Sequence, residues 1–182
     1  MSDNPELGVC YYPEHWSEDL WITDAKNIQK NGIKWVRIAE FAWSRIEPNP
    51  GDFNWNWLDK IVDILGNNNL KIIMCTPTAT PPKWLVDQMP DMVALDENGQ
   101  ARKFGSRRHY SFSHKGYQKE SQRITQAAAE RYGQNKYLQS WQTDNEYGCH
   151  ETTYSWCKSS LTEFRVWLKK KYKNIDDLNK SW

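Results

Sequence analysis

Short apolar runs alternate along the chain with longer segments in which apolar residues recur every three or four positions. The runs at 7–11, 34–38 and 70–75, and the start of 138–148, have the length and composition of buried β-strands. The segments between and after them have the spacing of amphipathic helices. The pattern therefore predicts strand followed by helix, four times over.

Several helix ends are also predicted. Ser17 is expected to cap the first helix, and Gly32 to stop it. Ser160 and Glu163 have the spacing of a capping box for the last helix, with an earlier start left open. The apolar face expected for the second helix consists of Trp57, Leu58, Ile61, Val62 and Leu65.

The segment from about residue 76 to residue 115 is predicted to be a long irregular loop. Pro77, Pro81 and Pro82 exclude a regular continuation of the third strand. Long loops inside a compact domain are commonly functional. We expect Arg108 and His109 in this loop to shape the wall of a site or to pair with acids.

Strands that alternate with helices indicate an α/β fold with a parallel sheet, either an open doubly wound sheet or a (β/α)8 barrel. No glycine-rich phosphate-binding turn occurs, and polar or aromatic residues follow every strand, as in barrel enzymes. Eight units need about 250 residues. We therefore expect residues 1–182 to be the N-terminal part of a (β/α)8 TIM-barrel domain, truncated after the fourth β/α unit.

The charge balance and the cysteine and tryptophan content limit which partners and which cellular compartment are expected. The 24 Lys and Arg residues balance 23 Asp and Glu residues, so neither nucleic acid nor an anionic membrane is expected as a partner. No secretory leader is present at the start, which predicts a cytoplasmic protein whose four cysteines are free thiols. Cys10 and Cys75 are expected to be buried. The 11 tryptophans suit an aromatic core or sugar-stacking faces, and for Trp43, Trp84 and Trp141 we favour the core.

Chemistry concentrates where the fourth strand ends, at Asn145 and Glu146. A carboxyl group in a partly desolvated cleft can donate a proton, and cleavage of an acetal requires one because a sugar oxygen is a poor leaving group. An adjacent amide can hold a ring hydroxyl. Taken alone, however, such a pair is more often a capping or salt-bridged acid at a strand end.

Five segments together resemble glycoside hydrolase family 42, the β-galactosidases: LGVCYYPEHW, VRIAEFAWSRIEPNPGDFNWNWLD, TPTATPPKWL, GSRRHY and WQTDNEYG. The resemblance implies a (β/α)8 barrel with catalytic glutamates on the fourth and seventh strands. It implies that Glu146 is the general acid/base, and that Asn145 and Arg37 bind substrate. Arg37 has a second interpretation, as the partner of an internal acid such as Glu40.

The chain departs from the family pattern in two respects. The nucleophile comes from the seventh strand, which lies outside this chain, so we expect the isolated 182 residues to be inactive. Many members also bind a structural zinc through four cysteines. The matching positions here are Ser111, Ser155, Cys157 and Ser160, so we expect no zinc, and a makeshift site from Cys149, His150 and Cys157 is not supported.

The predicted function is that of a retaining glycoside hydrolase, present as a fragment, which releases terminal non-reducing β-D-galactose from galactosides. No cofactor is expected, and the family implies a homotrimer for the complete protein. The alternatives are another β-glycosidase of the same clan, acting on an arabinoside or fucoside, and an inactive sugar-binding module.

Overall fold

The computed structural model describes residues 5–106, 108–148 and 154–182. The chain divides into two compact units, which are described separately. The first consists of Met1–Leu85 and Gln122–Tyr147, and the second of Val86–Ser121 and Gly148–Trp182.

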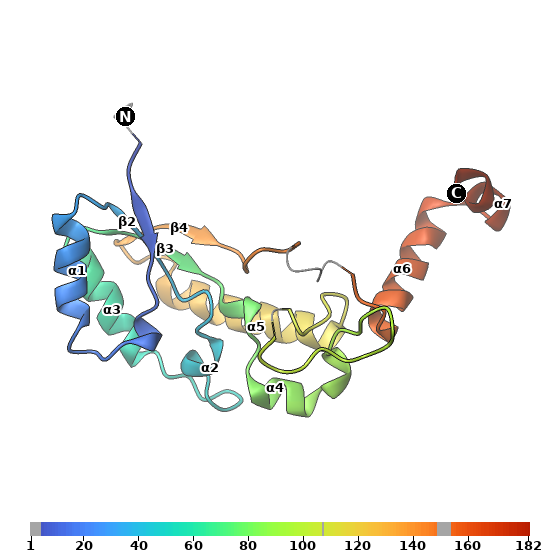
Figure 1. The fold of residues 1–182 in the computed structure, drawn as a ribbon, viewed down its shortest axis with the longest axis horizontal. Helices are drawn as coiled ribbons and strands as arrows, with labels where there is room; N and C mark the ends of the chain where they lie inside the picture. The colour runs from blue at the N-terminus through green and yellow to red at the C-terminus, as the bar shows by residue number, and fades with distance from the viewer. Residues whose placement is uncertain (1–4, 107, 149–153) are drawn as a thin grey trace. The chain divides into compact units, whose positions relative to one another are not determined.

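The first unit is built on a parallel sheet. Its strands are β1 (Gly8–Cys10), β2 (Trp35–Ile38), β3 (Lys71–Cys75) and β4 (Leu138–Gln142), and they are hydrogen-bonded in chain order (Figure 1). Val9 pairs with Val36, and Val36 with Ile72. Every neighbouring pair is parallel, so the carboxyl ends of the four strands lie at one edge of the sheet.

Helices cover one face of this sheet. The alternation of buried and half-buried residues in β2 turns Val36 and Ile38 toward the core, while Arg37 lies on the opposite face. Helices α1 (Trp21–Lys30) and α3 (Asn56–Asn67) contact each other, and α3 also contacts β3. The apolar face predicted for α3 is confirmed by the burial of all its members: Trp57, Leu58, Ile61, Val62 and Leu65.

Polar contacts and one glycine fix the helix α5 (Lys115–Tyr132) and the strand after it against α3. The Asp59 carboxyl of α3 accepts hydrogen bonds from Tyr132 Oη and Arg131 Nε, each at 2.8 Å. A Cβ atom added at Gly66 would lie 2.1 Å from the ring of Tyr137, so only glycine allows this ring to pack on α3.

Short helical pieces lie between the longer elements, and three of them interrupt the segment from about residue 76 to residue 115 that was predicted to be irregular. They are the 3-10 helices Pro13–His15, Pro77–Ala79 and Pro90–Met92 and the short α-helices α2 (Trp43–Ile46) and α4 (Lys83–Gln88). The second unit contains α6 (Lys158–Lys171) and α7 (Ile175–Ser181). No helix in the described part of the chain is long and apolar enough to cross a membrane.

Three predictions of detail were wrong. Helix α1 begins at Trp21, so Ser17 is not its cap, and its hydroxyl instead contacts Asp19. Helix α6 begins at Lys158 with Cys157 as N-cap, so Ser160 lies inside the helix and does not cap it, and the earlier start that the sequence left open is confirmed. Cys75 is buried as predicted, but Cys10 is exposed because, within the described part of the chain, β1 has a neighbouring strand on one side only.

Candidate active site

Side chains from β2 and β4 meet across the sheet near its carboxyl edge. Arg37 lies in β2, and its Nη1 donates a hydrogen bond of 2.8 Å to Oε1 of Gln142, the last residue of β4. Its guanidinium also forms an ion pair with Glu40, which is 3% exposed. One of the two interpretations predicted for Arg37, pairing with an internal acid, is therefore confirmed. The Nε atom of Arg37 has no hydrogen-bond partner among the described residues.

The loops that follow β3 and β4 are tied together by hydrogen bonds. Thr76 N donates to Gln142 O at 2.9 Å, and Asp144 N donates to Thr76 Oγ1 at 2.8 Å. Thr78 Oγ1 donates to Asp144 Oδ2 at 2.8 Å. The Gln142 amide, which accepts from Arg37, donates through Nε2 to Asp144 O at 2.9 Å. The strand ends of β2, β3 and β4 therefore form one connected polar network.

Asn145 and Glu146 extend directly from this network. The Asn145 backbone N–H donates to Asp144 Oδ1 at 2.7 Å. Asp144 and Glu146 have φ values of 53° and 46°, in the left-handed region of backbone conformation that residues other than glycine rarely adopt. Asn145 is half-buried and Glu146 is exposed in this chain. The partly desolvated setting expected for Glu146 is thus not formed by the described residues alone.

Other acids near strand ends have different environments. Glu40 is paired with Arg37, as described above. Glu47 is buried and accepts from Trp43 Nε1 at 2.9 Å and from Arg123 Nη2 at 2.7 Å, so it is held as a structural carboxylate. Both carboxyl oxygens of Glu14 are buried without a hydrogen-bond partner among the described residues, and burial raises its pKa.

The predicted tryptophan positions differ in burial. Trp43 is fully buried, as favoured for a core residue. Trp84 is half-buried and donates to Glu47 O at 3.0 Å, whereas Trp141 is 37% exposed on β4.

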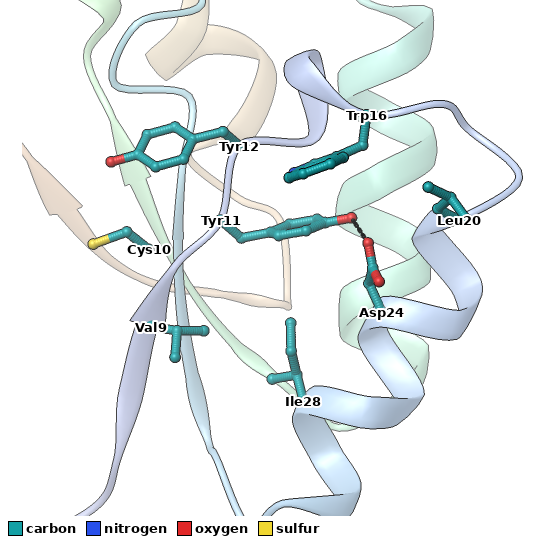
Figure 2. Close-up of a pocket in the computed structure, with 8 residues that line it drawn as sticks. All are labelled: Val9, Cys10, Tyr11, Tyr12, Trp16, Leu20, Asp24 and Ile28. Carbon is teal, nitrogen blue, oxygen red and sulfur yellow. Dashed lines mark hydrogen bonds between the residues drawn. The ribbon is translucent and has the colours of Figure 1, made fainter.

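A pocket of about 480 Å³ lies beside β1 and α1 (Figure 2). It is lined by Val9, Cys10, Tyr11, Tyr12, Trp16, Leu20, Asp24 and Ile28. Its one acid, Asp24, accepts a hydrogen bond of 2.7 Å from Tyr11 Oη, and burial together with this bond raises the pKa of Tyr11. The pocket is mostly apolar and offers no second acid, so it does not suit acid/base chemistry.

The second unit gathers the four positions that the family resemblance assigns to zinc ligands. Ser111 Oγ lies 3.0 Å from Ser160 Oγ, and the Cys157 thiol lies 3.3 Å from Ser160 Oγ. Ser155 Oγ accepts from Cys157 N at 3.3 Å. Burial alone would raise the pKa of Cys157, but hydrogen bonds from the surrounding serine hydroxyls outweigh it and lower the pKa to about 6.

The donor chemistry at these positions does not fit a zinc ion. Three of the four groups are hydroxyls, whereas structural zinc requires thiolate or imidazole ligands. No group of three or more His, Cys, Asp or Glu side chains suited to a metal occurs among the described residues. Cys149 and His150, the other residues of the makeshift site, lie outside the described residues.

In the same unit, Arg108 and His109 are buried. The Arg108 guanidinium lies 5.3 Å from the centre of the Phe112 ring. His109 Nδ1 lies 3.0 Å from Ser106 O, and burial lowers the pKa of His109. These are packing contacts, so the role of Arg108 and His109 in the wall of a site stays a prediction.

Glu146, Asn145 and Arg37 are predicted from the sequence as site residues, and these roles stay predictions. The place of Asp144 in the polar network was missed, and the one available signal was its position between the end of the strand and the Asn-Glu pair. Thr76 and Thr78, two polar residues that follow the third strand, were also not linked to Asp144.

Comparison with known proteins gives matches over nearly the whole chain. The family model for glycoside hydrolase family 42, described as beta-galactosidase, matches residues 10–182. A β-galactosidase of Thermus thermophilus is 48% identical over 176 residues, which are 97% of this chain and 27% of that protein. The crystal structure of a β-galactosidase from the psychrophilic Marinomonas ef1 superposes with a TM-score of 0.94 at 53% identity, covering 98% of this chain and 27% of the other.

A more distant structure supports the fold alone. The catalytic domain of a β-amylase from Paenibacillus polymyxa matches with a TM-score of 0.66 at 14% identity, covering 97% of this chain. The parallel sheet with its helices therefore corresponds to part of a (β/α)8 barrel. The chain spans about a quarter of the length of the β-galactosidases that it matches. It belongs to glycoside hydrolase family 42, the β-galactosidase family.

Proposed function

We propose that this chain supplies the acid/base half of the active site of a retaining β-galactosidase that removes terminal non-reducing β-D-galactose. One observation carries the proposal: Glu146 follows β4 at the carboxyl edge of the sheet, beside Asn145 and on the same edge as Arg37. Catalytic side chains of (β/α)8 enzymes are placed at this edge. The β-galactosidase names of the relatives support galactose as the sugar.

Glu146 has two roles in the proposed reaction. Its carboxylic acid donates a proton to the glycosidic oxygen while the bond from that oxygen to the anomeric carbon breaks and a second carboxylate attacks that carbon. Glu146, now a carboxylate, then takes a proton from the water that displaces the enzyme carboxylate. Asn145 holds a ring hydroxyl, and Arg37 orients the sugar from β2.

The second carboxylate belongs to a part of the barrel outside this chain. We propose that residues 1–182, both units included, are the N-terminal part of one barrel domain, and that the complete enzyme carries the remaining units. The unpaired edge of β1 and the apolar pocket beside it (Figure 2) suit the docking of a further β/α unit. We further propose a cytoplasmic enzyme that assembles as a homotrimer, to be checked by cell fractionation and light scattering.

Replacing Glu146 by Gln in the complete enzyme should remove the proton donor while preserving the shape of the side chain. We expect kcat/KM for lactose to fall by about 10²- to 10⁴-fold, the usual contribution of general acid catalysis. A dinitrophenyl galactoside needs little proton assistance to leave, so its kcat/KM should fall far less.

Azide provides the control for the second role of Glu146. As an anion it needs no general base, so it should restore turnover of the dinitrophenyl galactoside by E146Q and yield galactosyl azide. Equal losses on both substrates, with no rescue, would contradict the role proposed for Glu146.

The isolated 182 residues should show no measurable hydrolysis of nitrophenyl galactoside. A retaining glycosidase needs two carboxyl groups about 5–5.5 Å apart, and the second is proposed to lie outside this chain. Release of nitrophenol should be compared with that from the complete enzyme at the same molar concentration. Addition of the remaining barrel as a second polypeptide should restore activity, whereas family-like rates from the isolated chain would refute the proposal.

Arg37→Lys in the complete enzyme should separate sugar binding from the ion pair with Glu40. Lysine keeps the positive charge but loses the planar fork, so the inhibition constant of galactose should rise about tenfold, the equivalent of one charge-assisted hydrogen bond. Arg45→Lys is the matched control, because Arg45 lies over the Trp57 ring at 4.4 Å and should affect thermal stability alone. A lowered Tm with an unchanged inhibition constant would leave Arg37 a purely structural role.

Metal analysis of the purified protein should find no stoichiometric zinc. The triple variant S111C/S155C/S160C restores the four cysteines of the family pattern and should acquire about one zinc per chain. The fold already gathers the four positions, and four thiolates form a closed tetrahedral set. Adding Cys157→Ser to that variant should weaken zinc binding. One equivalent of zinc in the unmodified protein would overturn the prediction.

A further inference from the structure

We propose that Asp144 is a positioning residue that fixes the backbone from which Asn145 and Glu146 project, and that Thr76 and Thr78 hold it in place. The proposal rests on the proposed acid/base role of Glu146. In this proposal, a buried carboxyl group that does not touch the sugar determines how accurately Glu146 points at the oxygen that it protonates.

The first step is the burial of Asp144. Its side chain is 4% exposed, although a carboxyl group in the interior is unfavourable unless its oxygens are hydrogen-bonded. Both oxygens have donors: Oδ2 accepts from Thr78 Oγ1 at 2.8 Å, and Oδ1 accepts from Asn145 N at 2.7 Å. The group is therefore built into the fold at this point rather than left at the surface.

The second step is the direction of these bonds. Thr76 and Thr78 follow β3, while Asp144 follows β4, so the contacts join two neighbouring strand exits. The backbone of Asp144 is also held, since its N–H donates to Thr76 Oγ1 at 2.8 Å and its carbonyl accepts from Gln142 Nε2 at 2.9 Å. Side chain and main chain of this one residue are thus fixed to the sheet edge.

The third step is the backbone conformation. Asp144 and Glu146 both have positive φ, and such conformations persist where surrounding contacts enforce them. Aspartate tolerates this region, whereas glutamate does so less readily. The hydrogen bond from Asn145 N to Asp144 Oδ1 lies between the two unusual residues and ties the turn to the carboxyl group. Loss of that acceptor should allow the turn to relax and should redirect Glu146.

The consequence for catalysis follows from geometry. A general acid acts only within hydrogen-bonding distance of the oxygen that it protonates, and small misplacements cause large losses in rate. A misdirected Glu146 would therefore slow the cleavage of poor leaving groups selectively. A general loss of folded protein would instead lower the rates on all substrates alike.

The decisive experiment compares leaving groups in variants of the complete enzyme. Asp144→Ala removes both acceptor oxygens, and for this variant we expect kcat/KM to fall about tenfold or more on lactose, below the full loss for removal of the acid, and to change little on the dinitrophenyl galactoside. Thr78→Val removes the hydroxyl that donates to Asp144 and should show the same selectivity more weakly, while Thr78→Ser keeps a hydroxyl and should resemble the unmodified enzyme.

Asp24→Ala is the matched control, because it makes the same chemical change at a carboxyl group that is hydrogen-bonded to Tyr11 beside α1. It should leave the ratio of the two kcat/KM values unchanged. If Asp144→Ala yields too little folded enzyme, the Val and Ser variants of Thr78 decide the question. Equal losses on both substrates in Asp144→Ala and in Thr78→Val would overturn the proposal.

Failure of this inference is distinguishable from failure of the proposed function. If E146Q shows the dependence on leaving group and Asp144→Ala does not, Glu146 is the acid and Asp144 does not position it. If E146Q itself shows no such dependence, the acid/base assignment fails, and the positioning role fails with it.

Discussion

Parallel pairing of β1 to β4 is the constraint on which the rest of the structure depends. Strands that run in one direction place their carboxyl ends at one edge, so residues far apart in sequence meet there without any further folding device. Arg37 and Gln142 are 105 positions apart and are joined by a hydrogen bond of 2.8 Å. An antiparallel sheet would distribute the same residues over two opposite edges.

The strand ends also create a problem that the polar network solves. Where a strand stops, its backbone groups lose their ladder partners and need others if they are buried. The Thr76 hydroxyl, the Asp144 carboxyl and the Gln142 amide supply these partners after β3 and β4. The hydrogen bonds that satisfy the backbone are the same ones that set the conformation of the residues before Glu146.

Periodicity was sufficient to predict the strands, the parallel order and the buried face of α3, because each depends on apolar spacing within one segment. The environment of Asp144 could not be predicted in this way. Aspartate is normally exposed, and its partners Thr78 and Thr76 are 66 and 68 positions away. The prediction that Cys10 is buried failed for the opposite reason. Its apolar run is typical of a buried strand, but burial also requires neighbours on both sides, and among the described strands β1 pairs only with β2. The roles predicted for Glu146 and Asn145 came from family resemblance, since a lone Asn-Glu pair also suits a strand end.

The position of the proposed acid and its electrostatic environment have different origins. Its position is determined within this chain, by contacts among residues that follow β2, β3 and β4. The solvation of Glu146 is not determined within this chain, because its side chain is exposed here. An exposed carboxyl group lacks the desolvation that makes a glutamate a good proton donor at neutral pH. Under the proposed function, closure of the barrel would then add the nucleophile and exclude water from Glu146 in the same step. A half-barrel would hold the acid in its working direction but leave it in contact with water.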